Sequence, residues 1–138
     1  DDMDRVSQMV ERHPVTDHVI AYALRLVRAT RINEPMDNQG ERPRLVREYL
    51  SWGAGPRASE YLVLAARAKA LLSGDPMATA EHVKAVARPV LRHRILTNFN
   101  AEADRITTDA IIDDLLEGTP VDGMSAADRK QVDAVMRS

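Results

Sequence analysis

Apolar residues recur at intervals of three and four along most of this 138-residue chain, which is the spacing of one face of an α-helix. Prolines and glycines divide the pattern, because the residue before proline leaves the helical region and glycine often follows a helix end. The pattern predicts helices at residues 16–31, 44–52, 56–73, 79–88 and 107–117. A short leading helix over residues 4–12 is also expected, which gives five to six helices.

Threonine residues precede three of these segments. A threonine hydroxyl can accept a hydrogen bond from an unpaired backbone N–H in the first helical turn, so Thr16, Thr79 and either Thr107 or Thr108 are predicted to cap their helices. Pro89 interrupts the fourth segment. We therefore expect a kink or break near Arg88, with residues 90–95 forming a separate turn.

The longest apolar segment, residues 56–73, is expected to lie at the centre of the domain. Its predicted inward stripe consists of Tyr61, Leu64, Ala65, Ala68, Leu71 and Leu72. The predicted core of the whole domain consists of Leu26, Leu64, Ala68, Val83, Val86 and Ile112.

Two stretches lack a clear helical pattern. Residues 32–43 contain prolines and a glycine among charges and are expected to form a loop, and residues 96–106 are ambiguous. The expected organisation is a linker or short leading helix at residues 1–13, a helical domain at 14–120 and a tail or terminal helix at 121–138.

Composition supports an all-α fold, a small helical bundle. Only six glycines are present, which is too few for a strand-and-turn architecture, and the absence of cysteine excludes disulfides, Cys-ligated metals and a cysteine nucleophile.

The net charge of -2 gives no global attraction to nucleic acid or to an anionic membrane. No apolar run approaches the ~18 residues that span a bilayer, and the start of the chain is acidic. We expect neither membrane insertion nor secretion, and a cytoplasmic location.

Motifs for self-contained catalysis are missing. The sequence has no Gly-x-x-x-x-Gly-Lys-Ser/Thr phosphate loop, no Gly-x-Gly-x-x-Gly and no Gly-x-Ser-x-Gly, so the chain alone is expected not to hydrolyse a nucleotide. Its histidines have no zinc-binding spacing, and His18 and His82 are expected to be solvated. The acidic residues Asp109, Asp113, Asp114 and Glu117 are expected to form a solvated helix face. No metal site is predicted.

The most informative stretch is Gly53-Ala54-Gly55-Pro56-Arg57. Two glycines allow close backbone approach, proline fixes a helix start, and Arg57 then falls in the first turn beside unpaired N–H groups. A cation at this end costs a helix about 0.3–1 kcal/mol, which indicates that an anion is meant to bind there. The alternative is a plain helix–helix turn in which Arg57 is solvated or pairs with Glu60.

This stretch resembles the sensor-2 motif Gly-Ala-Ser-Pro-Arg in the helical C-terminal lid of the MoxR-type AAA+ ATPases. Residues 22–31 and 88–99 match further stretches of the same lid in the same order, so the resemblance covers about residues 13–118. Gly55 stands where the family usually has serine. Glycine is itself an acceptable capping residue, so the expected role of Arg57 is unaffected.

The resemblance implies that a nucleotide lies between an α/β core, with the phosphate loop and Mg²⁺-binding acid, and this lid. Gly53, Gly55, Pro56 and Arg57 would line the nucleotide, and Arg57 would reach the γ-phosphate and report ATP against ADP as a change in lid angle. ATP and Mg²⁺ are then expected in the full-length protein and neither on this chain alone. The implied partners are the chain's own core, neighbouring subunits of a ring, and von Willebrand factor A-domain proteins, in chaperone-like remodelling.

Two other classes remain open. A standalone nucleic-acid-binding module would use the arginine-rich segments 25–47 and 84–94, but acidic residues interrupt the first segment and few aromatic residues are available for stacking. A plain helical protein-interaction module would explain the amphipathic stripes. It would not explain the glycine-rich approach to Pro56 and Arg57.

Overall fold

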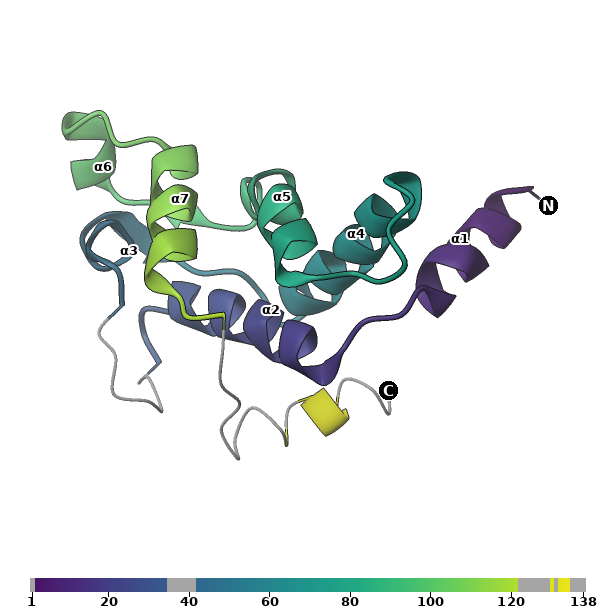
Figure 1. Ribbon diagram of the computed structural model, residues 1–138. Helices are drawn as coiled ribbons and strands as arrows, with labels where there is room; N and C mark the ends of the chain where they lie inside the picture. Colours follow the sequence, from purple (N-terminus) through teal and green to yellow (C-terminus); the bar gives the residue numbers. More distant parts are fainter. Residues whose placement is uncertain (1, 35–41, 122–129, 131, 135–138) are drawn as a thin grey trace.

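The computed structural model describes residues 2–34, 42–121, 130 and 132–134. Within residues 2–34 and 42–121 the chain forms seven helices and one two-stranded sheet (Figure 1). The helices are α1 (Asp2–Arg12), α2 (Asp17–Thr30), α3 (Arg44–Tyr49), α4 (Ala58–Leu72), α5 (Ala80–Leu91), α6 (Phe99–Ala103) and α7 (Thr108–Gly118). The strands are β1 (Leu50–Trp52) and β2 (Leu96–Thr97). The prediction of a small helical bundle is confirmed, and residues 130 and 132–134 are also helical.

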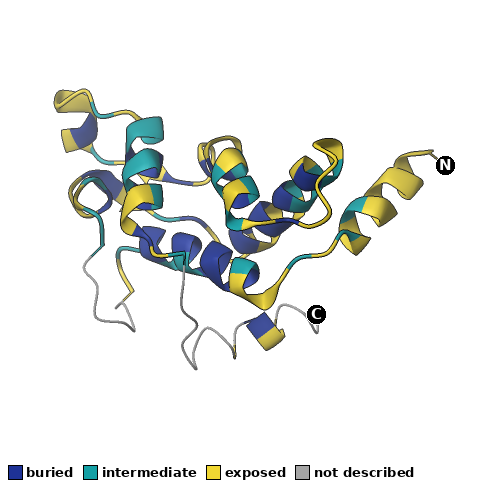
Figure 2. Cartoon of the chain, in the orientation of Figure 1, coloured by how far each residue is buried: buried dark blue, intermediate teal, exposed yellow. Residues whose placement is uncertain are grey.

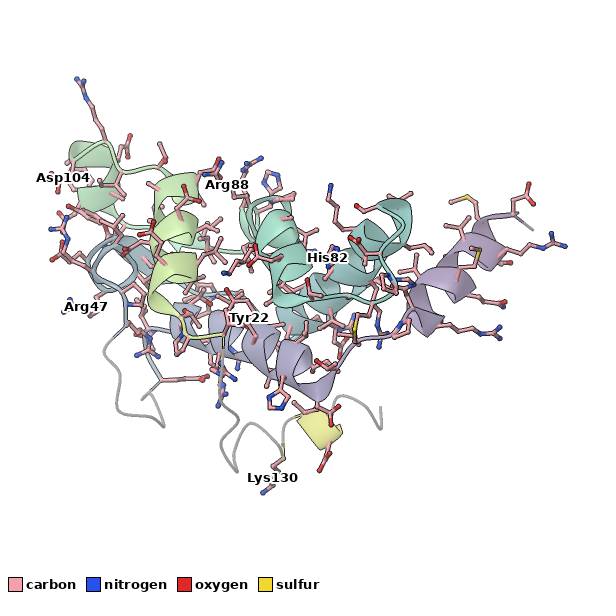
Figure 3. The ribbon with its side chains drawn as sticks, viewed as in Figure 1. Tyr22, Arg47, His82, Arg88, Asp104 and Lys130 are labelled. Atoms are coloured by element: carbon pink, nitrogen blue, oxygen red, sulfur yellow. The ribbon has the colours of Figure 1, made fainter. Side chains whose placement is uncertain are left out.

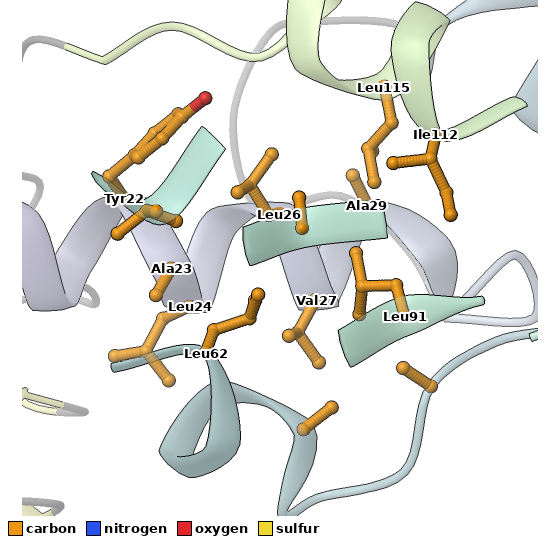
Figure 4. Close-up of a cluster of buried hydrophobic side chains, with 14 of the residues drawn as sticks. Tyr22, Ala23, Leu24, Leu26, Val27, Ala29, Leu62, Leu91, Ile112 and Leu115 are labelled. Atoms are coloured by element: carbon orange, nitrogen blue, oxygen red, sulfur yellow. The ribbon is translucent and has the colours of Figure 1, made fainter. Parts of the chain in front are cut away.

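Helix α2 is the centre of the bundle. It is buried along most of its length, and α4, α5 and α7 pack against it (Figures 1 and 2). Leu26 of α2, Leu62 of α4, Leu91 of α5, and Ile112 and Leu115 of α7 belong to one cluster of buried side chains (Figure 4). Each such fully buried side chain contributes about 1.5–3 kcal/mol to folding, so this cluster fixes the relative positions of four helices.

The predicted threonine caps are present. The hydroxyl of Thr16 accepts the N–H of Val19 at 3.4 Å, and that of Thr107 accepts the N–H of Ala110 at 3.1 Å. At α5 the cap is reciprocal, because the N–H of Thr79 donates to Nδ1 of His82 at 2.9 Å. The opposite nitrogen of His82, Nε2, donates to Asp75 at 2.7 Å. The prediction that His82 is solvated is therefore wrong.

Helix α4 uses a different face from the predicted one. Its buried residues are Ala58, Ser59, Leu62, Val63, Ala66 and Ala70, whereas Leu64 is 43% exposed and Leu72 87% exposed. Ala68 of α4 and Val86 of α5 are only partly buried, while Leu26, Val83 and Ile112 lie in the core as predicted. The helix is apolar on nearly all sides, so periodicity does not select the face. Close contact with α2 and α5 selects the alanine-rich one.

The predicted helix at residues 44–52 ends early. Helix α3 stops at Tyr49, and Leu50–Trp52 forms β1, which pairs antiparallel with β2. The ambiguous stretch 96–106 supplies β2 and α6. This pairing joins segments far apart in sequence, which local periodicity cannot show.

Pro89 does not end its helix. Helix α5 runs through it to Leu91, and the N–H of Arg92 still reaches the carbonyl of Arg88 at 2.9 Å. The predicted break near Arg88 is therefore wrong, and the turn expected at residues 90–95 is confined to residues 92–94, after the helix. Leu91 is fully buried, so its packing offsets the one hydrogen bond that proline removes in the last turn.

Two predicted regions are only partly described. Residues 35–41 of the predicted loop lie outside the described residues, as do 122–129, 131 and 135–138 of the predicted tail or terminal helix. Val132, which is described, is buried against the core cluster. No described helix combines the length and the apolar character that crossing a membrane requires.

Arg105 ends α6 in a strained conformation. Its φ is 59°, and the N–H of Ile106 bonds back to the carbonyl of Ala101 at 2.8 Å, a helix ending that favours glycine. Arg105→Gly is expected to raise the free energy of unfolding by about 0.5–1 kcal/mol, and the melting temperature by roughly 2–4 °C. Arg105→Ala keeps the Cβ atom and should melt like the wild type. A thermal melt in which the glycine variant gains nothing would contradict this reading.

Candidate functional site

The segment from Gly53 to Arg57 links strand β1 to helix α4. The N–H of Ala58 bonds to the carbonyl of Gly55 at 3.1 Å, so Pro56 and Arg57 form a turn that leads into the helix. Arg57 has φ −85° and ψ −6°, and its carbonyl accepts the N–H of Tyr61 at 3.1 Å. Helix α4 therefore begins at Ala58 rather than at Pro56, and Arg57 is its N-cap residue.

The side chain of Arg57 is exposed and makes no hydrogen bond or ion pair with any residue that the structure describes. The alternative pairing with Glu60 is absent from this part of the chain. No side chain caps the start of α4, a 15-residue helix of which the exposed Arg57 is the N-cap residue. A positive side chain thus stands at the position where the helix dipole is also positive, an arrangement suited to an incoming anion.

The two glycines of the segment have different surroundings. A Cβ atom on Gly53 would lie 2.1 Å from the carbonyl oxygen of Thr30, so the backbone there is packed directly against the end of α2. A Cβ atom on Gly55 would meet nothing within 4 Å. Close approach at Gly53 is therefore made to the chain's own helix, and Gly55 borders open space.

Hydrogen bonds fix Ala54 to the same end of α2. Its N–H donates to the hydroxyl of Thr30 at 3.0 Å, and its carbonyl accepts from Nε of Arg31 at 3.4 Å. Sequence analysis missed both partners, because no local signal connects residues 23 and 24 positions apart. The last turn of α2 therefore anchors the segment that carries Arg57.

Arg42 caps the C-terminal end of α2. Its Nε donates to the carbonyl of Ala29 at 3.0 Å, and its Nη2 donates to the carbonyls of Arg31 and Glu34, each at 2.5 Å. Burial is the main reason that the pKa of Arg42 is lowered, and the charge of Glu34 opposes the shift. The guanidinium satisfies backbone carbonyls that a helix end leaves without partners.

A second arginine lies on the same side of α4. Tyr61 follows Arg57 by one helical turn, so the two side chains share a face, and the guanidinium of Arg94 lies 4.5 Å from the centre of the Tyr61 ring. Trp52 and Leu96 are partners across the two strands and are 64% and 62% exposed. The segment is thus flanked by a cationic surface and by exposed apolar side chains.

The acidic face of α7 is exposed as predicted at Glu117, but Asp109 and Asp113 also pair with arginines of α5 and its C-cap while remaining 37% and 46% exposed. Arg88 projects from α5 (Figure 3) and binds both carboxylate oxygens of Asp113, at 2.9 and 2.5 Å. Arg92 binds Asp109 in the same way at 2.9 Å for each bond, which lowers the pKa of Asp109. Two arginines of the candidate nucleic-acid segment 84–94 are therefore already paired with carboxylates of the chain itself.

No group of three or more acidic or histidine side chains among the described residues is placed to hold a metal ion.

The chain is similar to known proteins in both sequence and structure. A family described as AAA lid domain matches residues 42–115, which include the segment that carries Arg57. Chaperone MoxR1 of Mycobacterium tuberculosis is 31% identical over 116 residues, which cover 84% of this chain and 29% of that protein. A crystal structure from Cytophaga hutchinsonii, assigned as an ATPase, has a TM-score of 0.70 and 28% identity, covering 84% of this chain and 34% of its own. The chain thus spans about a third of the length of each of these two relatives.

Proposed function

The chain belongs to the AAA lid domain family, as the lid of a MoxR-type AAA+ ATPase, and from this membership we propose that it closes over ATP bound to a separate α/β core. In this proposal Arg57 reaches the γ-phosphate and acts as the sensor-2 arginine. Gly53, Gly55 and Pro56 shape the backbone that brings it there.

The proposal rests on the exposure of the Arg57 side chain and on its lack of a partner among the described residues. Its guanidinium is exposed at the positive end of α4 and has no partner among the described residues. A phosphate presented by the core would pair with the guanidinium through charge-assisted hydrogen bonds and would lie toward the positive end of the α4 dipole. The cost of a cation at this end of the helix is then offset by the bound nucleotide.

The residues present indicate which parts of the nucleotide site the lid supplies and which parts the core supplies. The described residues supply a phosphate-binding cation but no cluster of acidic or histidine side chains suited to Mg²⁺. We assign the metal-binding acid and the phosphate loop to the core, where the ion would neutralise charge on the phosphates. Arg57 adds a fixed positive charge from the lid side, which stabilises the transferring phosphoryl group and favours the closed lid when ATP is bound.

At the level of the whole protein, we propose a ring-forming ATPase that remodels partner proteins. One relative is named a chaperone, which supports this activity. The lid would contact its own core and a neighbouring subunit, and partners with von Willebrand factor A domains follow from the family resemblance.

The proposal is tested by comparing nucleotide affinities in the full-length ATPase. Arg57→Ala is expected to weaken binding of a slowly hydrolysed ATP analogue by about tenfold or more, because a charge-assisted contact to phosphate is lost. ADP lacks the γ-phosphate, so its affinity should change much less. Arg44→Ala, at an exposed arginine that pairs with Glu48 on α3, serves as the matched control. Equal loss for both nucleotides, or none, in calorimetric titrations would contradict the proposal.

A further inference from the structure

The hydroxyl group of Thr30 links the central helix to the segment that carries Arg57. We propose that Thr30 is a positioning residue, which holds Arg57 in place through the backbone of Ala54. The proposal rests on the function proposed for Arg57. It concerns a residue that has no contact with the nucleotide and lies outside the glycine-rich motif.

The Thr30 side chain is held in one orientation. It is 1% exposed, its hydroxyl donates to the carbonyl of Val27 at 2.6 Å, and the same oxygen accepts the N–H of Ala54 at 3.0 Å. Because the donor hydrogen is committed to Val27, the oxygen lone pairs face Ala54. Ala54 itself is buried, so its N–H has no access to water as an alternative partner.

Ala54 is the last buried residue before Arg57. Gly55 borders open space, Pro56 is exposed, and the Arg57 side chain makes no bond to the described residues. The next buried residues are Ala58 and Ser59 in the first turn of α4, and the Arg57 carbonyl accepts the N–H of Tyr61. The Arg57 backbone is therefore held by α4 on one side and, through Ala54, by the Thr30 bond on the other.

Loss of the Thr30 bond should loosen one end of this short span. A shift of about 1 Å in a charged group at a reacting phosphate can lower turnover by as much as ~100-fold, even when the group itself is intact. Arg31 supports the same residue more weakly, since its bond to the Ala54 carbonyl is long, at 3.4 Å, and its side chain is 29% exposed.

The test is a double-mutant cycle on kcat in the full-length ATPase. Thr30→Val keeps the shape but removes the hydroxyl, and should lower kcat by about tenfold, whereas Thr30→Ser should stay within about twofold of wild type. In an Arg57→Ala background, Thr30→Val should change kcat by less than about twofold, because the residue through which it acts is gone.

A matched control removes an equivalent bond elsewhere. The hydroxyl of Thr107 also accepts one backbone N–H, at the start of α7, away from the segment. Thr107→Val should leave kcat unchanged in both backgrounds. Amide hydrogen exchange gives a readout independent of turnover: the Ala54 amide should exchange faster in Thr30→Val, but not in Thr30→Ser or Thr107→Val.

The outcomes separate the two proposals. If Arg57→Ala alone leaves kcat unchanged, the sensor function fails and the role of Thr30 fails with it. If Arg57→Ala lowers kcat but Thr30→Val has no effect, or the same effect in both backgrounds, only the role of Thr30 is overturned. Should Thr30→Val not fold, Thr30→Ala replaces it in the cycle. That variant also removes the hydroxyl that binds the Ala54 N–H, and a loss of kcat of the same size in the Arg57→Ala background would overturn the proposal.

Discussion

Replacing Gly53 by alanine is expected to lower the free energy of unfolding by about 2–4 kcal/mol, which corresponds to a fall of roughly 5–15 °C in melting temperature. The added Cβ atom would lie 2.1 Å from the carbonyl oxygen of Thr30 and 2.9 Å from the backbone nitrogen of Arg31. Both are backbone atoms at the buried end of α2, so no side chain can move aside. Either the segment or the helix end must shift, and the bonds to Ala54 would be lost with it.

Gly55 provides the matched control within the same motif. A Cβ atom there meets nothing within 4 Å, and its φ lies outside the left-handed region. Gly55→Ala should therefore melt at the wild-type temperature or slightly above it, because alanine restricts the unfolded chain more than glycine does. Gly55→Ser should also fold normally, in keeping with the serine that the related motif carries. Similar melting temperatures for the Gly53 and Gly55 variants would show that the packing against α2 is not as described.

Local features of the fold could be predicted from the sequence because their causes are local. Thr16 caps α2 and Thr107 caps α7, as their positions before the apolar repeats indicate. The start and end of α2 lie within one residue of the predicted 16–31. These features depend on neighbours within one helical turn, which the sequence shows directly.

Features that depend on distant contacts could not be predicted. Helix α4 is apolar on several sides, and only its neighbours α2 and α5 determine that Leu62 is buried while Leu64 is exposed. Strand β1 exists because residues 50–52 meet residues 96–97, and nothing near Leu50 indicates that partner. In both cases tertiary contact overrides the local pattern.

The candidate site shows the same division. The exposed position of Arg57 beside a helix start followed from the proline and glycine that precede it. The difference between Gly53 and Gly55 did not, because both glycines look alike in sequence and only the end of α2 distinguishes them. The anchoring roles of Thr30 and Arg42 were likewise invisible, since each depends on a carbonyl or amide that the fold brings close.

The arginine at the start of α4 should matter for turnover and hardly at all for folding. Arg57→Ala is expected to lower kcat of the full-length ATPase by about ten- to a thousandfold, as loss of other donors that stabilise transition-state charge does. Its effect on the melting temperature should be small. The side chain is exposed and without a partner among the described residues, and removing a cation from the positive end of a helix is slightly stabilising.

The variant Arg57→Lys distinguishes the effect of a planar, two-point hydrogen-bond donor from the effect of positive charge alone. Arg57→Lys keeps the positive charge at the start of α4 but replaces the forked guanidinium, which can bind two phosphate oxygens at once, with a single ammonium group. It should therefore recover only part of the lost turnover in a steady-state ATPase assay. Full recovery would indicate that charge alone acts at this position. If Arg57→Ala instead unfolds the lid while the folded full-length variant keeps wild-type turnover, Arg57 is a structural residue, and the anion that its exposed position indicates does not bind there.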